Sequence, residues 1–219
     1  MRDRSAPLSA QDISELGWQK MNGLLPAIVQ DAASGRVLML GYMNEEALAK
    51  SLQSGLATFF SRSKNRLWQK GETSGHHLRI HSVFADCDHD ALLVLADPVG
   101  PTCHTGSTSC FGESAIDGPA WLGDLTRVVR ERAQAGDAAS YTHRLLVDGP
   151  GRVAQKVGEE GVEVALAAVS RPPSECAEEL ADLFYHVIVL MESLNISWND
   201  VIKRLKARHA SASSATASS

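Results

Sequence analysis

Short apolar runs separated by polar turns dominate the first half of the chain. They predict strands over 24–30, 36–43, 57–63, 77–85 and 91–96. One helix interrupts them, because Asn44 can cap a helix that starts at Glu45 and Gly55 can end it. Turn-forming residues at 31–35 and 64–66 predict two hairpins. Short strands with one early helix favour an α+β or mainly β domain.

The spacing of apolar residues becomes helical after residues 112–119, a polar stretch that contains glycine. Helical spacing begins with Leu122 and Leu125, and it continues through 153–169 and 174–194 on either side of a proline pair. We therefore expect an α+β protein whose β-rich domain spans 1–116 and whose all-α helical bundle spans 117–209.

The end of the chain has its own helix signal. Ser197 and Asp200 resemble a capping box for a last helix that ends near His209. The remaining residues, 210–219, are only serine, alanine and threonine, and we expect them to be disordered.

Composition narrows the class of protein. Of the 219 residues, 44% are hydrophobic and 21% are charged, as in an ordinary globular protein. The net charge of -5 argues against a general nucleic-acid binder. No apolar run approaches the roughly 18–20 residues of a membrane span, so we expect no membrane partner. The polar stretch 1–10 lacks the features of a secretory signal, and we expect the cytoplasm.

Asp86, Asp88 and Asp90 alternate with Cys87 and His89. In an extended segment, alternate side chains share one face, so the three carboxylates would repel each other unless a cation neutralised them. Oxygen ligands suit Mg²⁺, whereas a thiolate suits Zn²⁺. We expect a magnesium site at the three aspartates and leave His89 without a role. An acidic surface turn is the alternative.

Two more cysteines follow at Cys103 and Cys110. Their spacing does not fit a C-x-x-C zinc knuckle, but with Cys87 they make a three-thiolate set, which leaves a zinc ion one open position. Such a zinc lowers the pKa of bound water to about 7, and His104 is a candidate general base. The alternative is that each cysteine is a small buried hydrophobe.

Basic residues near a loop rich in glycine, threonine and serine are candidate phosphate ligands. These candidates are Arg62, Lys64, Lys70, Thr73 and Ser74. An exposed basic hairpin is the alternative.

Several of these segments together resemble phosphoribosyl-AMP cyclohydrolase of histidine biosynthesis, over about residues 15–112. The segments are 24–31, 39–44, 60–63, 67–68, 70–76, the aspartate and cysteine cluster, 103–106 and 109–111. The resemblance implies a dimer of a β-rich fold that opens the adenine ring of phosphoribosyl-AMP between N1 and C6.

The same resemblance implies the ligands. Zinc would be bound across the subunit interface by Cys87, Cys103 and Cys110, and magnesium by Asp86, Asp88 and Asp90. His104 would handle protons, and His76 is a second acid/base candidate.

The second half carries two pairs of carboxylates at i, i+3 spacing. Glu160 and Glu163 form one pair, and Glu179 and Asp182 form the other. On facing helices they would make a four-carboxylate magnesium site. A solvated acidic helix face is the alternative.

The helix around Asp182 is apolar from residue 180 to 191 except for Asp182 and His186. An all-round apolar helix is expected to be buried, so Asp182 needs a partner. His186 is either that partner or a structural residue.

Segments 140–142, 155–160 and 178–186 resemble phosphoribosyl-ATP pyrophosphohydrolase, over about residues 121–209. That resemblance implies hydrolysis of the α–β phosphoanhydride of phosphoribosyl-ATP with release of pyrophosphate, assisted by Mg²⁺. Lys156 could neutralise a phosphate.

The two halves therefore suggest a bifunctional hydrolase of histidine biosynthesis, with Zn²⁺ and Mg²⁺ as cofactors and phosphoribosyl-ATP and phosphoribosyl-AMP as substrates. We expect a homodimer with a shared zinc site. The alternatives are a general nucleotide pyrophosphohydrolase fused to a zinc domain and a non-catalytic metal-binding scaffold.

Overall fold

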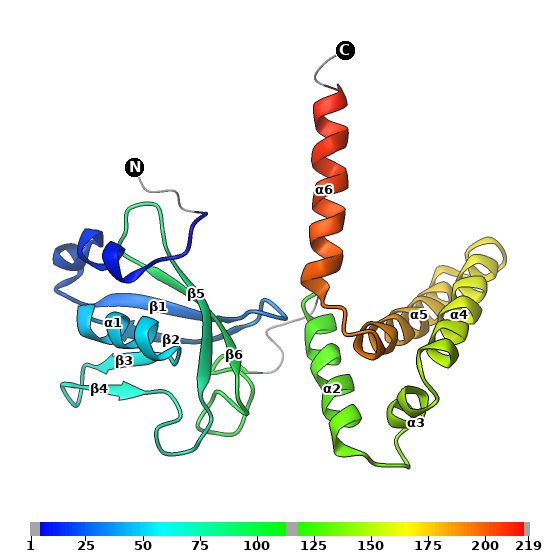
Figure 1. The fold of residues 1–219 in the computed structure, drawn as a ribbon, viewed down its shortest axis with the longest axis horizontal. Helices are drawn as coiled ribbons and strands as arrows, with labels where there is room; N and C mark the ends of the chain where they lie inside the picture. Colours follow the sequence, from blue (N-terminus) through cyan, green and yellow to red (C-terminus); the bar gives the residue numbers. More distant parts are fainter. Residues whose placement is uncertain (1–4, 113–117, 217–219) are drawn as a thin grey trace. The chain divides into compact units, whose positions relative to one another are not determined.

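The computed structural model describes residues 5–112 and 118–216, with side chains through His209. The chain divides into two compact units, Met1–Trp121 and Leu122–Ser219, and each is considered by itself (Figure 1). The expected domain boundary at 116/117 involves residues 113–117, which lie outside the described ranges.

A four-stranded sheet forms the centre of the first unit, in the order β2-β1-β6-β5. The strands are β1 (Leu25–Asp31), β2 (Val37–Met43), β5 (Leu78–Ala85) and β6 (Leu92–Pro98). β1 pairs antiparallel with β2 and parallel with β6, and β5 pairs antiparallel with β6. β3 (Thr58–Ser61) and β4 (Arg66–Gln69) form a separate hairpin. The expected strands and both hairpins are confirmed.

Local sequence explains the helix α1 (Glu45–Ser54). The Asn44 side chain accepts a hydrogen bond of 2.8 Å from the amide of Ala47, and Gly55 ends the helix with φ 71°. Residues on one face of α1 are buried in a core that also contains Phe59 and Leu25. Two short 3₁₀ helices, η1 (Ala10–Glu15) and η2 (Trp18–Met21), precede the sheet.

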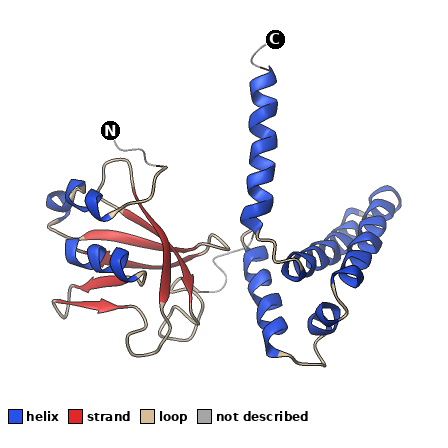
Figure 2. Cartoon of the chain, in the orientation of Figure 1, coloured by secondary structure: helices blue, strands red, loops and turns tan. Residues whose placement is uncertain are grey.

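Helices build the second unit (Figure 2). They are α2 (Trp121–Ala135), α3 (Tyr141–Val147), α4 (Pro150–Ser170), α5 (Pro173–Ser193) and α6 (Trp198–Thr216). Proline occupies the first turn of α4 and α5, where its missing N–H costs no hydrogen bond. The core between the helices consists of Val129, Leu145, Val153, Ile188 and Val189. The expected order of a β-rich part followed by an all-α part is confirmed.

Three features differ from expectation. Helix α3 was not expected; the side chain of Ser140 caps it by accepting a 3.4 Å hydrogen bond from the His143 amide. The capping box of Ser197 and Asp200 is present, but α6 continues to Thr216. The expectation of a disordered tail is therefore wrong up to Thr216, because a run of alanine and serine can propagate a helix that is already nucleated. Residues 217–219 lie outside the described ranges.

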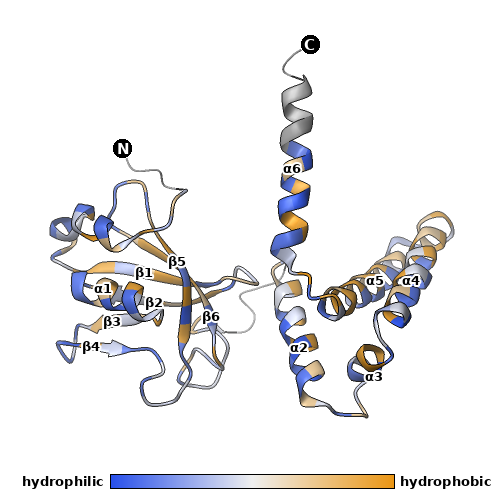
Figure 3. Ribbon diagram, viewed as in Figure 1, coloured by the Kyte–Doolittle hydropathy of each residue, from blue (hydrophilic) through white to orange (hydrophobic). Residues whose placement is uncertain are grey.

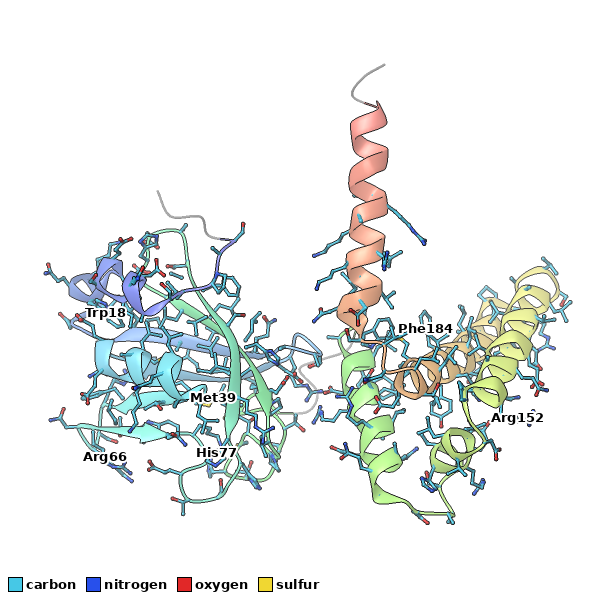
Figure 4. All side chains as sticks on the ribbon, in the orientation of Figure 1. Trp18, Met39, Arg66, His77, Arg152 and Phe184 are labelled. Carbon is cyan, nitrogen blue, oxygen red and sulfur yellow. The ribbon has the colours of Figure 1, made fainter. Side chains whose placement is uncertain are left out.

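Helix α5 is also less buried than expected. Figure 3 shows many hydrophobic residues on α4 and α5. On α5, Leu180 is 38% exposed and Phe184 (labelled in Figure 4) is 43% exposed. Within one chain, only the second half of α5 is buried. The expectation of a helix buried on all sides is therefore wrong for its first half.

Within the described ranges, no helix has by itself the length and apolar composition needed to cross a membrane; α5 and α6 reach that length and composition only together, and they are bent by 107° at their junction.

Candidate metal centres

The three aspartates of the first unit meet at a turn. β5 ends at Ala85, and Asp86 accepts hydrogen bonds of 3.0 and 3.1 Å from the amides of Asp90 and Ala91. Ligand oxygens of Asp86, Asp88 and Asp90 all lie within 4.8 Å of one another. The expected alternation along an extended segment is therefore wrong, although the three carboxylates do converge. His89 adopts the left-handed conformation, with φ 64°, that this turn requires.

Lys20, in η2, provides a positive charge next to this aspartate cluster. Its Nζ lies 2.8 Å from the carbonyl oxygen of Asp88, 3.2 Å from Asp88 Oδ2 and 3.9 Å from Asp90 Oδ2. The Lys20 hydrogen bond lowers the pKa of Asp88, whereas partial burial and the charges of Asp88 and Asp86 raise the pKa of Asp90. Convergent carboxylate oxygens are the donors that Mg²⁺ prefers, so this donor set fits that ion.

Cys103 and Cys110 line a cavity of about 510 Å³ in the first unit. The loop between β4 and β5 and the loop after β6 form its walls. Of the residues predicted from sequence, those lining it are Lys70, Thr73, Ser74, His76, Cys103, His104 and Cys110. Figure 4 labels Met39, which also lines the cavity, and His77, which follows the lining residue His76 in the sequence. Seven predicted residues from two loops are thus brought into one cavity.

The two thiols differ in acidity. The Thr105 hydroxyl donates to Cys103 Sγ over 3.1 Å, and this bond, with further bonds from the Thr105 amide and Ser107, lowers the pKa of Cys103 to about 6. Burial and the nearby Cys103 raise the pKa of Cys110. Burial also lowers the pKa of Lys70, against the opposing charges of Cys110 and Cys103. A preformed thiolate beside a second thiol is a donor pair that suits zinc.

Two glycines hold the loop that carries His76. A methyl group at Gly100 would lie 2.8 Å from the His76 ring, and one at Gly71 would lie 2.6 Å from the His76 carbonyl oxygen. Lys70 Nζ also donates to that carbonyl over 3.2 Å. The absence of a side chain at both glycines allows the backbone to pack this closely against His76.

Sequence reasoning missed Thr102, which also lines this cavity. It is 3% exposed, and its hydroxyl oxygen has no hydrogen-bond partner among the described residues. A buried hydroxyl without a partner is costly, which suits a side chain that hydrogen-bonds a substrate. In the sequence, only the position of Thr102 next to Cys103 indicated that it could belong to the site.

Cys87 lies away from the other two thiols within one chain. Cys87 follows Ala85 at the end of β5. The Cys110 amide donates to the carbonyl oxygen of Leu38 over 2.8 Å, so Cys110 lies beside β2. β2 and β5 are the two edges of the sheet, three strand spacings or roughly 14 Å apart. Zn–S bonds are only about 2.3 Å long, so the three thiols of one chain do not meet at one zinc ion in this fold.

Arg62 and Lys64 do not line the cavity. The guanidinium carbon of Arg62 lies 3.9 Å from the centre of the Tyr42 ring. Lys64 occupies the exposed turn between β3 and β4, where its amide donates to Ser61 Oγ over 3.3 Å. Their assignment as phosphate ligands stays a prediction.

The second unit has a carboxylate cluster between α4 and α5. Oxygens of Glu160, Glu179 and Asp182 lie within 4.8 Å of one another. Glu163 belongs with them electrostatically, because the negative charge of Glu179 raises its pKa, with a smaller contribution from Glu160. The i, i+3 spacing on two facing helices therefore brings all four predicted carboxylates to one place. The donors fit Mg²⁺.

Basic side chains surround this cluster. Lys156 Nζ lies 2.7 Å from Glu159 Oε2 and 3.2 Å from Glu160 Oε1. Arg171 Nη1 lies 2.7 Å from Glu179 Oε1. Lys156 also lines a cavity of about 440 Å³, in which basic side chains outnumber one carboxylate; the polar lining residues are Tyr141, His143, Arg144, Asp148 and Arg152 (the last labelled in Figure 4). A cluster for cations thus adjoins a basic cavity suited to phosphate.

His186 connects the carboxylates to α3. Its Nδ1 lies 2.9 Å from the carbonyl oxygen of Asp182 and 3.5 Å from Glu160 Oε1, and its Nε2 lies 3.1 Å from the Tyr141 hydroxyl. His186 therefore contacts the backbone of Asp182, and the carboxylate beside it belongs to Glu160. Sequence reasoning missed Tyr141 as a site residue because α3 was not expected.

Comparison with known proteins connects these sites to two activities. The family model described as phosphoribosyl-AMP cyclohydrolase matches residues 39–112, and the one described as phosphoribosyl-ATP pyrophosphohydrolase matches residues 122–209. The histidine biosynthesis bifunctional protein HisIE of Salmonella typhimurium is 52% identical over 204 residues, which cover 92% of this chain and 99% of that protein. The chain belongs to the HisIE family.

Two further relatives agree. The HisIE protein of Yersinia pestis is 50% identical over 92% of this chain and 98% of its own length, and that of Vibrio cholerae is 53% identical over 89% and 93%. The protein is thus a bifunctional hydrolase of histidine biosynthesis with phosphoribosyl-AMP cyclohydrolase and phosphoribosyl-ATP diphosphatase activities. The cyclohydrolase match contains the aspartate turn and the three cysteines, and the pyrophosphohydrolase match contains the four carboxylates.

Proposed function

We propose that each activity has its own metal centre. The N-terminal unit would open the adenine ring of phosphoribosyl-AMP at N1–C6 with zinc and magnesium, and the helical unit would hydrolyse phosphoribosyl-ATP with magnesium. The observation that carries the proposal is the separation of two chemically different donor sets, thiols in one unit and carboxylates between α4 and α5 in the other. Each set lies within the family match for its activity.

The zinc ligands would be Cys103 and Cys110 of one chain and Cys87 of a second chain in a homodimer. The strand order supports this arrangement, because Cys87 follows β5 at one edge of the sheet and Cys110 lies beside Leu38 of β2 at the other edge. When bound, zinc supplies a Lewis acid that makes water nucleophilic near neutral pH. The thiolate character of Cys103 supports it as a ligand.

The chain's own groups would handle protons and phosphate at that site. His104 Nδ1 lies 3.9 Å from Cys103 Sγ, which supports His104 as the base that takes a proton from the attacking water. His76, across the same cavity, is the second acid/base group. Lys70, Thr73 and Ser74 would bind the phosphate.

Magnesium in the first unit would be held by Asp86, Asp88 and Asp90. Because these residues flank Cys87, whichever cavity receives Cys87 also receives the aspartates. The dimer would therefore combine the magnesium ligands of one chain with the zinc-binding cavity of the other.

In the helical unit, Glu160, Glu163, Glu179 and Asp182 would bind the magnesium that clamps the triphosphate. Lys156 is supported as a phosphate ligand because it reaches both the carboxylates and the basic cavity. Exposed apolar side chains further support a homodimer: Val162 and Leu166 on α4 are 59% and 55% exposed. The cytoplasmic location stays a prediction.

The test is a two-step assay on the purified, zinc-loaded protein with Mg²⁺ and phosphoribosyl-ATP. We expect pyrophosphate release and then the ring-opened product. Cys103→Ala should abolish ring opening and leave pyrophosphate release largely intact. Loss of both activities in a protein whose helical unit remains folded would contradict two separate centres.

Three control measurements address the alternatives. Equal cleavage of common nucleoside triphosphates would favour a general nucleotide pyrophosphohydrolase. Retained ring opening in Cys103→Ala, or a protein that holds no zinc by metal analysis, would overturn the zinc assignment.

A further inference from the structure

A chain of polar contacts leads from α3 to the carboxylate cluster of the helical unit. The Tyr141 hydroxyl lies 3.1 Å from His186 Nε2, and His186 Nδ1 lies 3.5 Å from Glu160 Oε1. His186 is 5% exposed and Glu160 is 7% exposed, whereas Tyr141 is 45% exposed. Two buried polar groups are thus connected to a hydroxyl at the surface of the unit.

The carbonyl group beside Nδ1 determines which nitrogen of the His186 ring must carry a hydrogen. The carbonyl oxygen of Asp182, 2.9 Å from Nδ1, can only accept, so Nδ1 carries a hydrogen. In the neutral ring, Nε2 then accepts a hydrogen bond from the Tyr141 hydroxyl. Tyr141 and the backbone of α5 therefore hold the ring from both of its nitrogens.

Among the described residues, two nitrogen atoms approach one oxygen of Glu160. Lys156 Nζ, at 3.2 Å, and His186 Nδ1, at 3.5 Å, both approach the same oxygen, Oε1. A carboxylate restrained through one oxygen presents the other in a defined direction, which reduces the ordering needed when a cation binds. The ring of His186 lies between these groups and the aromatic rings of Tyr141 and Tyr185.

We propose that Tyr141 and His186 are positioning residues for the magnesium ligand Glu160. Tyr141 fixes the orientation of the His186 ring, and the ring, whose Nδ1 lies 3.5 Å from Glu160 Oε1, limits the movement of that carboxylate. The inference rests on the magnesium site proposed above for the helical unit. It gives a role to α3, which packs Tyr141 against α5 but supplies none of the four carboxylates.

The chain offers a matched pair of substitutions. Tyr141→Phe removes the hydroxyl on His186 and keeps the ring. Tyr185→Phe removes a hydroxyl from the same contact between α3 and α5, where it lies 2.8 Å from Thr142 Oγ1, but that hydroxyl does not touch His186 Nε2 or a carboxylate. The two variants therefore lose the same chemical group from the same packing region and differ in its connection to Glu160.

The readout is Mn²⁺ affinity without substrate, measured by calorimetry and by electron paramagnetic resonance on the full zinc-loaded chain. Every protein carries Asp88→Asn and Asp90→Asn, so that the aspartate turn does not contribute a second site. We expect Tyr141→Phe to weaken Mn²⁺ binding about tenfold, as loss of a supporting group typically does, and Tyr185→Phe to change it less than about twofold.

A second pair tests His186 itself. His186→Asn keeps an N–H donor near the position of Nδ1, whereas His186→Leu removes it, so the Asn variant should retain more Mn²⁺ affinity. Thermal unfolding of each variant separates affinity from stability. If His186→Leu does not fold, the two tyrosine variants still decide the question.

The possible results distinguish the positioning role of Tyr141 and His186 from the magnesium site on which it rests. Equal Mn²⁺ affinities for Tyr141→Phe and Tyr185→Phe would overturn the positioning role and leave the magnesium site intact. If Glu160→Gln does not weaken Mn²⁺ binding in the parent protein, the magnesium site itself is wrong and the inference fails with it.

Discussion

Mixing two inactive cysteine variants should restore ring opening if the zinc ligands come from two chains. Cys87→Ser and Cys103→Ser each remove one thiolate, so each homodimer should lack cyclohydrolase activity while it retains pyrophosphate release. The reason to expect rescue is geometric. Cys87 follows β5 at one edge of the four-stranded sheet, and Cys110 lies beside β2 at the other edge, three strand spacings or roughly 14 Å away.

The size of the rescue follows from the symmetry of a dimer. Each dimer would have two equivalent zinc sites, and each site would combine Cys87 of one chain with Cys103 and Cys110 of the other. After random exchange of equal amounts of the two variants, about half of the dimers are mixed. One of the two sites in a mixed dimer is intact, so the activity should reach about one quarter of that of the unsubstituted protein.

The assay is ring opening of phosphoribosyl-AMP after the two variants are unfolded and refolded together with zinc. The matched control mixes Cys103→Ser with Cys110→Ser. Both of these thiols must come from the same chain, so every site in that mixture lacks one of them and no activity should return. Failure of the first mixture, or rescue in the second, would refute the shared site, provided that pyrophosphate release shows that all proteins have refolded.

Three further predictions concern the first unit. In the zinc-free protein, the rate at which iodoacetamide alkylates Cys103 should be half-maximal near pH 6 and should fall below that pH as the thiol is protonated. The reason is that hydrogen bonds from Thr105 and Ser107 lower the pKa of Cys103 to about 6. Thr105→Val should move this midpoint to higher pH, and an unchanged midpoint would contradict the cause. Asn44→Ala should lower the free energy of unfolding by about 1 kcal/mol in urea titration, because it removes the cap of α1; no measurable loss would argue against that cap. Gly41→Ala should lower the free energy of unfolding by about 1–3 kcal/mol in the same titration, because the added methyl group would overlap the buried ring of Phe59. Gly55→Asn should lower it less, because the space around the Cβ position of Gly55 is open.

Local patterns in the sequence determined the elements and most of the donor sets. The helix that starts at Glu45 was predictable because Asn44 and Gly55 act on the backbone within one turn of its ends. Similarly, the i, i+3 spacing of Glu160 with Glu163 was sufficient to predict a shared helix face. Motif resemblance then identified both activities. Each of these features depends on residues close together in the chain, so the sequence carries the information directly.

The tertiary structure decided what depends on residues far apart in the chain. The aspartates converge through a turn that His89 closes, and the strand order of the sheet separates Cys87 beside β5 from Cys110 beside β2. Helix α3 was missed because its seven residues give too short a periodic pattern, and its position depends on packing against α4 and α5. Only that packing brings the Tyr141 hydroxyl to His186, because a contact between distant residues is set by the folded core and not by local spacing.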